Sequence, residues 1–193
     1  SFIHQGEEKV GFNSAEKGAI FHLAMQLLDF SKFDTEDVSK IREEIKLQIN
    51  SFVEKNIMSL DEIETININW IVKFIQSEIF KEIYIANKSE KLFKEKAIDY
   101  NIKLKNLFKD ENIEEDEKIM IVGIIDLFFE NENGEIILLD YKTDYVTKEN
   151  LEEVKARYKV QLDLYKSAIE DISGKKVAKK GLYLFGINEF VEI

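Results

Sequence analysis

Two strand-like runs in the second half of the chain are apolar at consecutive positions, yet each contains an aspartate. The first run covers residues 119–129 and contains Asp126, and the second covers 135–142 and contains Asp140. Side chains alternate between the two faces of a strand, so a run that is apolar at odd and even positions is buried on both faces. A carboxylate in such a strand is costly unless it is paired or binds a cation. The two runs therefore predict a buried site built on carboxylates.

The turn between the two runs decides whether the aspartates meet. Asn133-Gly134 permits a two-residue type I′ turn, which would place Asp126 opposite Tyr141 and send the two carboxylates to opposite faces. A three-residue loop with Gly134 in the left-handed conformation would instead place Asp126 directly opposite Asp140, with Cβ atoms about 4.5–5.5 Å apart. We predict the second register, in which a divalent cation between the carboxylates would relieve their repulsion.

Lys142 lies two residues after Asp140 and therefore shares its face of the strand. Phosphodiester hydrolysis builds negative charge on phosphate oxygens, which a Mg²⁺-class ion and a neighbouring lysine both stabilise. Asp-x-Lys alone occurs often by chance, and these residues could be ordinary strand-end charges. The addition of Asp126, across a hairpin between doubly apolar strands, favours the site of a metal-dependent nuclease.

The first half of the chain is predicted to be helical. Apolar residues at helical spacing, with caps at Ser14 and at Asp34 or Thr35, predict helices over 15–30, 35–55, 59–65 and 67–86. The second half is predicted to contain strands over 91–107, 119–129, 135–142 and 181–187, an acidic loop over 110–117, and a helix over 147–172 that Gly174 ends. This order predicts an α/β fold with a mixed β-sheet flanked by helices.

Composition restricts the domain organisation and the classes of site. The 193 residues suffice for one domain, in which 1–90 would be the helical region and 91–193 the β-β-β-α-β core. The chain has no Cys, which excludes disulfides, Cys-ligated zinc and Cys-ligated iron–sulfur clusters and fits a reducing, cytoplasmic location. We find no membrane span, no signal peptide and no GxxxxGK[ST] loop of a nucleotide-hydrolysing motor. Because the chain starts at Ser1, we expect it to be a piece of a larger protein.

The net charge of −11 argues against a general nucleic-acid binder, which usually carries a basic face. It is compatible with an enzyme that clusters carboxylates for a metal ion and receives its substrate from another domain. The C-terminal third is more basic than the rest. Such residues usually form a solvated face, but they could also contact a phosphate backbone; they are Lys148, Lys155, Arg157, Lys159, Lys175, Lys176, Lys179 and Lys180.

Taken together, four segments resemble the RecB-like branch of the PD-(D/E)XK nucleases. These segments are Gly123-Ile-Ile-Asp126, Leu139-Asp140-Tyr-Lys142-Thr-Asp144, Tyr158-Lys-Val-Gln161-Leu-Asp-Leu-Tyr165 and, upstream, Ala15-Glu-Lys-Gly18-Ala-Ile-Phe-His22. The likeness is less distinctive over 34–89. Within this branch the chain is most similar to the C-terminal nuclease domains of AddA-type helicase–nuclease subunits. It lacks the iron–sulfur cysteines of AddB-type subunits, which favours the AddA side.

The resemblance implies a restriction-endonuclease-like core with a Mg²⁺ site, which Mn²⁺ could also occupy. The implied metal ligands are His22, Asp126, Asp140 and the backbone carbonyl of Tyr141, and Lys142 is implied as the catalytic lysine. The resemblance also implies partners, namely single-stranded DNA, helicase domains of the same chain and a second, AddB-like subunit. The implied role is exonucleolytic cleavage during double-strand-break repair and recombination.

The resemblance further implies that Gln161 and Tyr165 support the site or the DNA strand. Gln161 lies on the apolar stripe of its helix and needs polar partners, so it could also be a satisfied core residue. Tyr158 is expected in the core. Glu95 is the candidate for an acidic residue that the branch often carries on the strand before the hairpin.

His22 has an alternative interpretation, because a lone helical histidine among apolar neighbours is more often a core or boundary residue than a ligand. A neutral imidazole can ligate a divalent ion, and the likeness of the segment Gly18-Ala-Ile-Phe-His22 favours a ligand. Two alternatives to the helicase–nuclease assignment stay open at this point. One is a catalytically silent module that guides DNA or docks another protein chain of the assembly, and the other is a stand-alone nuclease of the same superfamily.

Overall fold

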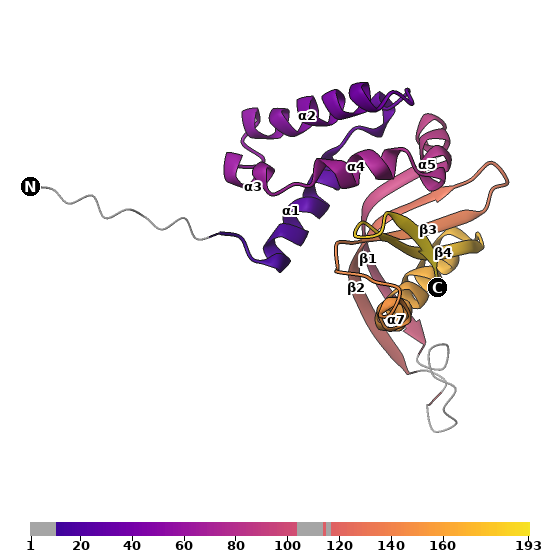
Figure 1. The fold of residues 1–193 in the computed structure, drawn as a ribbon. Coiled ribbons are helices and arrows are strands. Elements are labelled where there is room, and N and C mark those ends of the chain that lie inside the picture. The colour runs from indigo at the N-terminus through magenta and orange to yellow at the C-terminus, as the bar shows by residue number, and fades with distance from the viewer. Residues whose placement is uncertain (1–10, 104–113, 115–116) are drawn as a thin grey trace, which may run out of the picture.

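A computed structural model describes residues 11–103, 114 and 117–193. Within these residues, helices come first in the chain, and a five-stranded sheet with one long helix follows, as Figure 1 shows. The α/β fold expected from the sequence, a mixed sheet flanked by helices, is confirmed. The acidic loop expected over 110–117 lies, apart from 114 and 117, outside the described residues, as does the end of the strand expected over 91–107.

The described part of the first half forms five α-helices and one 3₁₀ turn. They are α1 (Ser14–Leu27), η1 (Phe30–Lys32), α2 (Val38–Glu54), α3 (Leu60–Glu64), α4 (Ile68–Ile75) and α5 (Glu78–Lys88). The helix predicted over 67–86 is in fact two helices. Ser77 separates them, because its side chain caps α5 by accepting a hydrogen bond from the Phe80 N–H at 3.3 Å.

The first two helix caps differ from the sequence prediction. Asn13, and not Ser14, is the N-cap of α1, because its side chain accepts from the Glu16 N–H while the Glu16 carboxylate accepts from the Asn13 N–H. Helix α2 starts later than predicted, at Val38, and Asp37 caps it. Asparagine and aspartate satisfy free N–H groups at a helix start as well as serine and threonine do.

The sheet has the strand order β1-β2-β3-β4-β5. Its strands are β1 (Leu92–Lys103), β2 (Lys118–Glu130), β3 (Ile136–Lys142), β4 (Val177–Leu184) and β5 (Glu189–Glu192). Strands β3 and β4 are parallel and are joined by α7 (Leu151–Ser173), whereas the other neighbours are antiparallel. Gly174 ends α7 in the left-handed conformation, as predicted. Strand β5 is absent from the sequence prediction, and β4 starts four residues earlier than expected.

Two apolar cores cover the two faces of the sheet. On one face, residues such as Leu127, Leu139 and Tyr141 pack beneath the helices of the first half. On the other face, residues such as Leu138 and Leu182 pack against α7. Strand β3 and the end of β2, from Ile125, are buried as the doubly apolar runs predict, so a charged side chain there lies far from water. The prediction is wrong for the start of the first run, because there β2 pairs with β1 alone and its apolar side chains are exposed; they are Ile119, Met120, Val122 and Ile124. Among the described residues, no helix has the length and apolar character needed to cross a membrane.

Candidate active site

The β2–β3 hairpin has the predicted three-residue turn. Gly134 has a φ of 79°, its N–H donates to the Asn131 carbonyl, and the Asn131 N–H donates to the Glu135 carbonyl at 2.9 Å. The ladder pairs Leu127 with Leu139. The same register, continued by one residue, places Asp126 opposite Asp140. The prediction of the bulged register is therefore confirmed, and the two-residue turn is excluded.

The backbone ladder between β2 and β3 stops where the aspartates begin. Its last pair is Leu127 with Leu139, and the next free donor, the Tyr141 N–H, donates instead to Asp126 Oδ2 at 2.7 Å. Among the described residues, Asp126 and Asp140 are the two charged residues in the buried class, with exposed fractions of 8% and 3%. Both carboxylates therefore require compensation inside the protein.

Lys142 supplies some of this compensation. Its Nζ lies 2.6 Å from Asp140 Oδ2, and both side chains are largely buried, so the prediction that they share a face is confirmed. The contact is an ion pair whose angles do not meet those of a hydrogen bond, since Asp140 Oδ2 is buried and accepts no hydrogen bond. Burial, together with the charge of Asp126, raises the pKa of Asp140 to about 6 despite Lys142. Burial alone would lower the pKa of Lys142. The Asp140 carboxylate outweighs burial, and the pKa of Lys142 is therefore raised.

Helix α1 brings His22 to the hairpin. The His22 Nδ1 lies 3.5 Å from Asp126 Oδ1. Burial lowers the pKa of His22, but the hydrogen bond and charge of Asp126 outweigh it, so the pKa lies above 6.5. One turn earlier, a Cβ on Gly18 would lie 3.2 Å from Thr143 Oγ1, so a glycine lets α1 approach the end of β3. His22 is thus next to the carboxylates, as its predicted ligand role requires, and the role itself stays a prediction.

Glu95 lies beside Asp126 on the neighbouring strand. Strand β1 pairs Lys94 with Leu127 and Lys96 with Ile125, so Glu95 falls opposite Asp126. Its φ of 49° is unusual for a residue with a side chain. Burial and the charge of Asp126 raise the pKa of Glu95. Glu95, Asp126 and His22 line one open hollow of about 450 Å³ between α1 and the sheet.

The strand alternation changes at this position. Leu127 packs under the helices, whereas Ile125, two residues earlier, packs against α7. On β1, the Lys94 ammonium lies 4.0 Å from the centre of the Phe30 ring under the helices, whereas Ile98 packs against α7. On both strands, the alternation of side chains between the two faces of the sheet is therefore interrupted at the opposed residues Glu95 and Asp126. This interruption explains why these two residues do not form a ladder pair.

Helix α7 contributes Gln161 and Tyr165, which contact each other. Gln161 Nε2 donates to the Tyr165 hydroxyl at 3.1 Å. Tyr165 is buried and packs onto Gly123 of β2, where a Cβ would lie 2.8 Å from its hydroxyl. The role of Gln161 at a metal-bound water or at DNA stays a prediction.

Tyr158 lies at the edge of the core. As expected it packs against the core on the α7 face of the sheet, but it is only partly buried, and its ring lies 4.2 Å from Lys142 Nζ. Its hydroxyl lies 3.2 Å from both oxygens of Asp144. Tyr158 precedes Gln161 by three residues on the same helix face, and this spacing is the signal that could have assigned it to the site.

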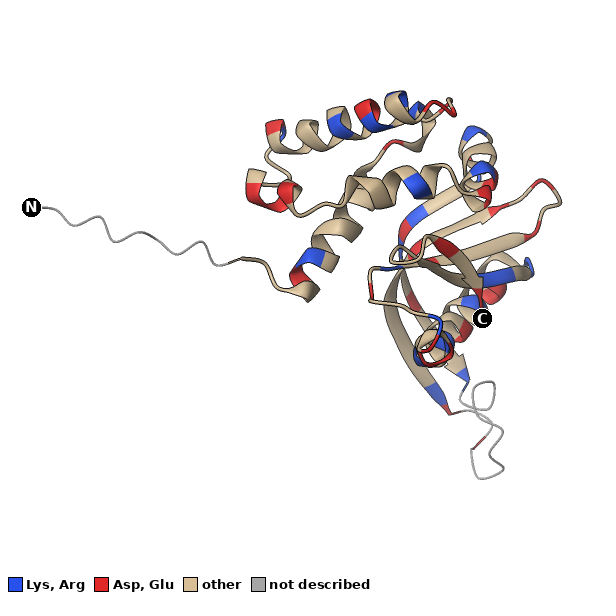
Figure 2. Cartoon of the chain, in the orientation of Figure 1, with Lys and Arg blue, Asp and Glu red and all other residues tan. Residues whose placement is uncertain are grey.

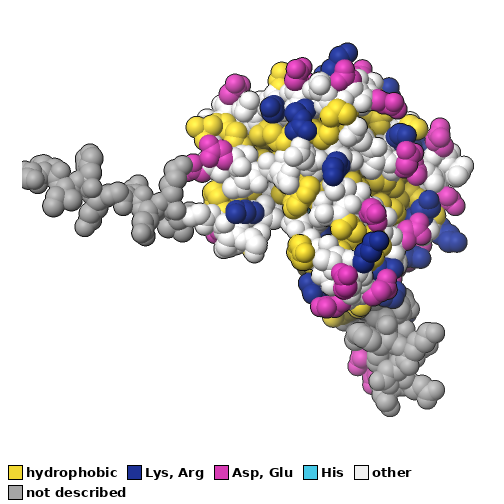
Figure 3. All heavy atoms as spheres, viewed as in Figure 1, with side chains coloured by type: hydrophobic (Ala, Val, Ile, Leu, Met, Phe, Trp, Pro, Cys, Tyr) yellow, Lys and Arg dark blue, Asp and Glu magenta, His cyan; other side chains and the backbone are white. Residues whose placement is uncertain are grey.

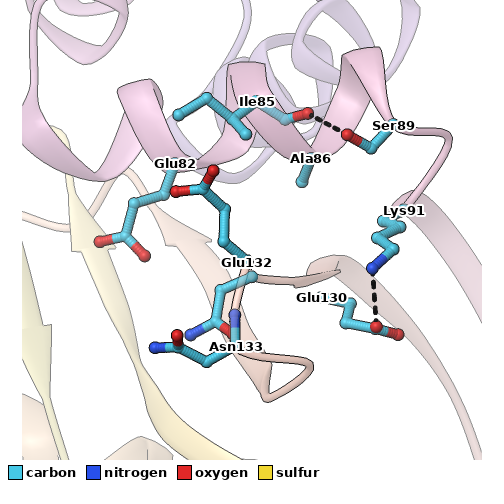
Figure 4. A pocket seen from close by; sticks show the side chains of 9 residues that line it. Glu82, Ile85, Ala86, Ser89, Lys91, Glu130, Glu132 and Asn133 are labelled. Carbon is cyan, nitrogen blue, oxygen red and sulfur yellow. Dashed lines mark hydrogen bonds and ion pairs between the residues drawn. The ribbon is translucent and has the colours of Figure 1, made fainter.

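A second hollow, of about 220 Å³, lies between the end of α5 and the β2–β3 turn (Figure 4). It is lined by Glu82, Glu132 and Lys91, and Lys91 forms an ion pair with Glu130 at 2.9 Å. Its carboxylates belong to the partly buried or exposed class. The hollow at Asp126 is the better candidate, because of the two only that one contains a buried charge.

The side chains at the hairpin fit a divalent cation. Carboxylate oxygens and an imidazole are ordinary ligands of such ions, and Asp140 Oδ2 is buried without a directed donor. In the described regions of the chain, no three His, Cys, Asp or Glu side chains are already gathered as a metal site. The side chains that contact these carboxylates are His22 beside Asp126, at 3.5 Å, and Lys142 beside Asp140, at 2.6 Å.

The basic residues of the C-terminal third are mostly paired. Arg157 and Lys155 contact acidic residues on α7, Lys159 and Lys180 both contact Asp163, and Lys175 contacts Glu130. Figure 2 shows acidic and basic residues side by side along α7, and Figure 3 shows them interspersed over the face in view. These pairs favour the solvated-face interpretation of the basic residues over a DNA-binding strip.

Comparison with known proteins agrees with the geometry. Residues 3–191 match the family model of the PD-(D/E)XK nuclease superfamily. The chain is 39% identical over 189 residues to the A subunit of the ATP-dependent helicase/nuclease of Clostridium botulinum, and this match covers 97% of the chain and 14% of the relative. It is 42% identical over 182 residues to the same subunit of Thermoanaerobacter sp., covering 93% of the chain and 14% of the relative.

The same subunit of Clostridioides difficile is 37% identical over 198 residues, which cover 98% of the chain and 15% of the relative. The chain thus spans about one seventh of the length of these relatives. The match with the family model extends over the α1 segment, the β2–β3 hairpin and α7. By its sequence and its fold, this chain belongs to the PD-(D/E)XK nuclease superfamily.

Proposed function

We propose that the chain is a metal-dependent nuclease domain that hydrolyses phosphodiester bonds of single-stranded DNA, exonucleolytically, with Mg²⁺ or Mn²⁺. The observation that carries the proposal is the buried pair Asp126 and Asp140, placed opposite each other with Lys142 against the second carboxylate. A purely structural module has no need to bury two mutually repelling carboxylates. The membership of the nuclease superfamily supports the same activity.

The ligands proposed for the metal are His22, Asp126, Asp140 and the Tyr141 carbonyl. When bound, a divalent ion supplies polarisation of the phosphate and a more acidic water. Lys142 is proposed as the catalytic lysine, because its ammonium is buried beside Asp140 and remains charged, so it can stabilise charge that develops on a phosphate oxygen. Glu95 is proposed as a further acidic group of the site, since it shares the hollow with Asp126.

Gln161 and Tyr165 are proposed to support the site or the DNA strand. Their mutual hydrogen bond and the contact of Tyr165 with Gly123 tie α7 to β2 three residues before Asp126. A shift of α7 would therefore be transmitted to the strand that carries this ligand.

We further propose that the domain works inside a longer helicase–nuclease in double-strand-break repair and recombination. In this proposal residues 1–193 are one nuclease domain, with a helical region over 1–90 and the core over 91–193, and an AddB-like subunit completes the assembly. The relatives, which are A subunits of helicase/nucleases, support it. The net charge of −11 and the paired lysines also support it, because other domains would then supply most of the affinity for DNA.

The decisive experiment compares the wild-type chain with Asp140→Ala and Lys142→Ala on single-stranded DNA, in Mg²⁺ and in EDTA. We expect cleavage by the wild type in Mg²⁺ only, and a loss of about 10²-fold or more in each variant. Lys46→Ala, which changes an exposed lysine of α2, is the matched control and should cleave normally. Undiminished cleavage by the two site variants would refute the assignment.

The alternative is a catalytically silent module that guides DNA or docks another protein chain. It predicts no metal affinity in the wild-type chain, whereas the nuclease predicts binding of Mn²⁺ that Asp140→Ala abolishes. Calorimetry with Mn²⁺ therefore separates the two proposals independently of any DNA substrate.

A further inference from the structure

Lys142 is held from two sides. Its ammonium lies 2.6 Å from Asp140 Oδ2 and 4.2 Å from the centre of the Tyr158 ring. A lysine side chain has four flexible carbons and no preferred direction at its end. The carboxylate fixes one contact, and the electron-rich ring face fixes a second, so together they define where the ammonium sits.

Tyr158 is itself anchored. Its hydroxyl lies 3.2 Å from Asp144 Oδ1 and 3.2 Å from Asp144 Oδ2. The hydroxyl therefore donates to the Asp144 carboxylate, whose two oxygens are equally close. Asp144 follows Lys142 by two residues, whereas Tyr158 belongs to α7. Arg157 Nη1 lies 3.8 Å from the same carboxylate. The ring therefore bridges from the helix to the segment directly after β3.

We propose that Tyr158, anchored by Asp144, is a positioning residue that holds the Lys142 ammonium against Asp140. The catalytic consequence of this role rests on the proposed nuclease function, because only there does Lys142 act on a substrate. The hydrogen bond from the hydroxyl to Asp144 fixes the ring in its place over the ammonium. The ring face supplies attraction without adding another negative charge to a site that already has two buried carboxylates.

The geometry makes Tyr158 the suitable residue among its neighbours on α7. Gln161 and Tyr165 bond to each other, and Tyr165 packs onto Gly123. Tyr158 is the described aromatic residue whose ring lies over the Lys142 ammonium. Leucine at this position would fill similar space but would offer neither the π face nor the hydroxyl.

The first test asks, by NMR of the 193-residue chain with labelled lysine methylenes, whether the Lys142 side chain lies over the Tyr158 ring in solution. Protons that lie over a ring face are shifted upfield, and Lys142→Arg identifies the resonance. We expect Tyr158→Leu to abolish the upfield shift of the Lys142 ε-methylene. Tyr145→Leu, which removes an 85% exposed tyrosine close in sequence, is the control and should leave the shift unchanged. An unchanged shift in folded Tyr158→Leu would overturn the proposal.

The anchor has its own test, which also applies if Tyr158→Leu fails to fold. Tyr158→Phe keeps the ring and removes the hydroxyl, and Asp144→Ala removes the acceptor. We expect each single variant to change the Lys142 chemical shift by a similar fraction of the change seen in Tyr158→Leu. The double variant should change it no further than either single variant. Effects that add in the double variant, or no movement in either single variant, would overturn the anchoring by Asp144.

The last test is kinetic and separates this inference from the proposed function. On single-stranded DNA with saturating Mg²⁺, we expect Tyr158→Leu to lower kcat about tenfold with KM unchanged, and Tyr158→Phe to lower it less. A wild-type chain that does not cleave would refute the nuclease assignment, while the NMR result would still decide the positioning. A normal kcat in a variant with a displaced Lys142 would overturn the catalytic aspect of the inference.

Discussion

The Asp126 carboxylate accepts a hydrogen bond from the backbone N–H of Tyr141 at 2.7 Å. This side chain takes a donor that a strand partner would otherwise use, at the point where the β2–β3 ladder ends. One oxygen of Asp126 therefore holds the two strands together, while the other faces His22 at 3.5 Å. The residue thus has a structural role that is separable from its proposed role as a metal ligand.

Substitution of Asp126 should separate these two roles. Asp126→Ala leaves the buried Tyr141 N–H without an acceptor, so we expect a loss of about 1–3 kcal/mol in the free energy of unfolding by urea. Asp126→Asn retains an acceptor oxygen and should lose much less stability, yet both variants should lose Mn²⁺ binding in calorimetry. Equal destabilisation by Asn and Ala would contradict the structural role of this hydrogen bond.

Asp140 should lower the stability of the protein when no metal is bound. Its folded-state pKa of about 6 lies above the ordinary value of 3.8, through burial and the charge of Asp126. A raised carboxyl pKa contributes stability that is present below pH 3.8 and is lost as the pH rises through 6. In EDTA at about pH 7.5 we therefore expect Asp140→Asn to be more stable than the wild type by about 1–3 kcal/mol.

The advantage of Asp140→Asn should shrink as the pH falls from about 7.5 to about 4, because the wild-type carboxyl is then protonated. Asp99→Asn, which changes an exposed aspartate of β1, serves as the control and should show no such pH-dependent gain. Thermal unfolding over this pH range checks both variants. If the wild type unfolded at a higher temperature than Asp140→Asn at about pH 7.5, the ion pair with Lys142 would outweigh the cost of burying the Asp140 carboxylate.

Metal affinity should depend on pH through the same groups. A cation competes with protons for its ligands, and the pKa of Asp140 is about 6 while that of His22 lies above 6.5. We expect Mn²⁺ to bind about tenfold or more weakly at about pH 5.5 than at about pH 7.5, with proton release at the lower pH. Calorimetry in buffers of different ionisation enthalpy measures both quantities. A flat pH profile would exclude His22 and Asp140 as ligands.

The hairpin was predictable from the sequence because its information is local. The doubly apolar runs correctly indicate burial for β3 and for the end of β2, though not for residues 119–124. Gly134 fixes the turn, so the register of Asp126 and Asp140 follows from residues that lie close in the chain. The same reasoning places Lys142 beside Asp140. Side chains on a strand alternate between its two faces, and the turn requires a positive φ that favours glycine. Together these two constraints leave few possible registers for the hairpin.

The remaining features depend on tertiary packing. His22 lies about a hundred residues before the hairpin, and only the resemblance to a known family connected them. The bonding of Tyr158 to Asp144, and the change of face at Glu95, arise from how α7 and β1 lie on the sheet. The break at Ser77 had a local signal, a serine followed by Glu78 at a helix start, which the continuous apolar spacing of 67–86 concealed.

Gly123 gives the last prediction, because it sets how closely α7 approaches β2. A Cβ there would lie 2.8 Å from the Tyr165 hydroxyl and 3.2 Å from its ring carbon Cε1. Gly123→Ala should therefore displace Tyr165 and destabilise the fold by about 1–3 kcal/mol. Removal of the hydroxyl relieves the shorter contact, so Gly123→Ala should cost clearly less in a Tyr165→Phe background. Gly11→Ala, with nothing within 4 Å of the added carbon, should be neutral. Strictly additive costs for Gly123→Ala and Tyr165→Phe in urea unfolding would show that the two residues do not constrain each other.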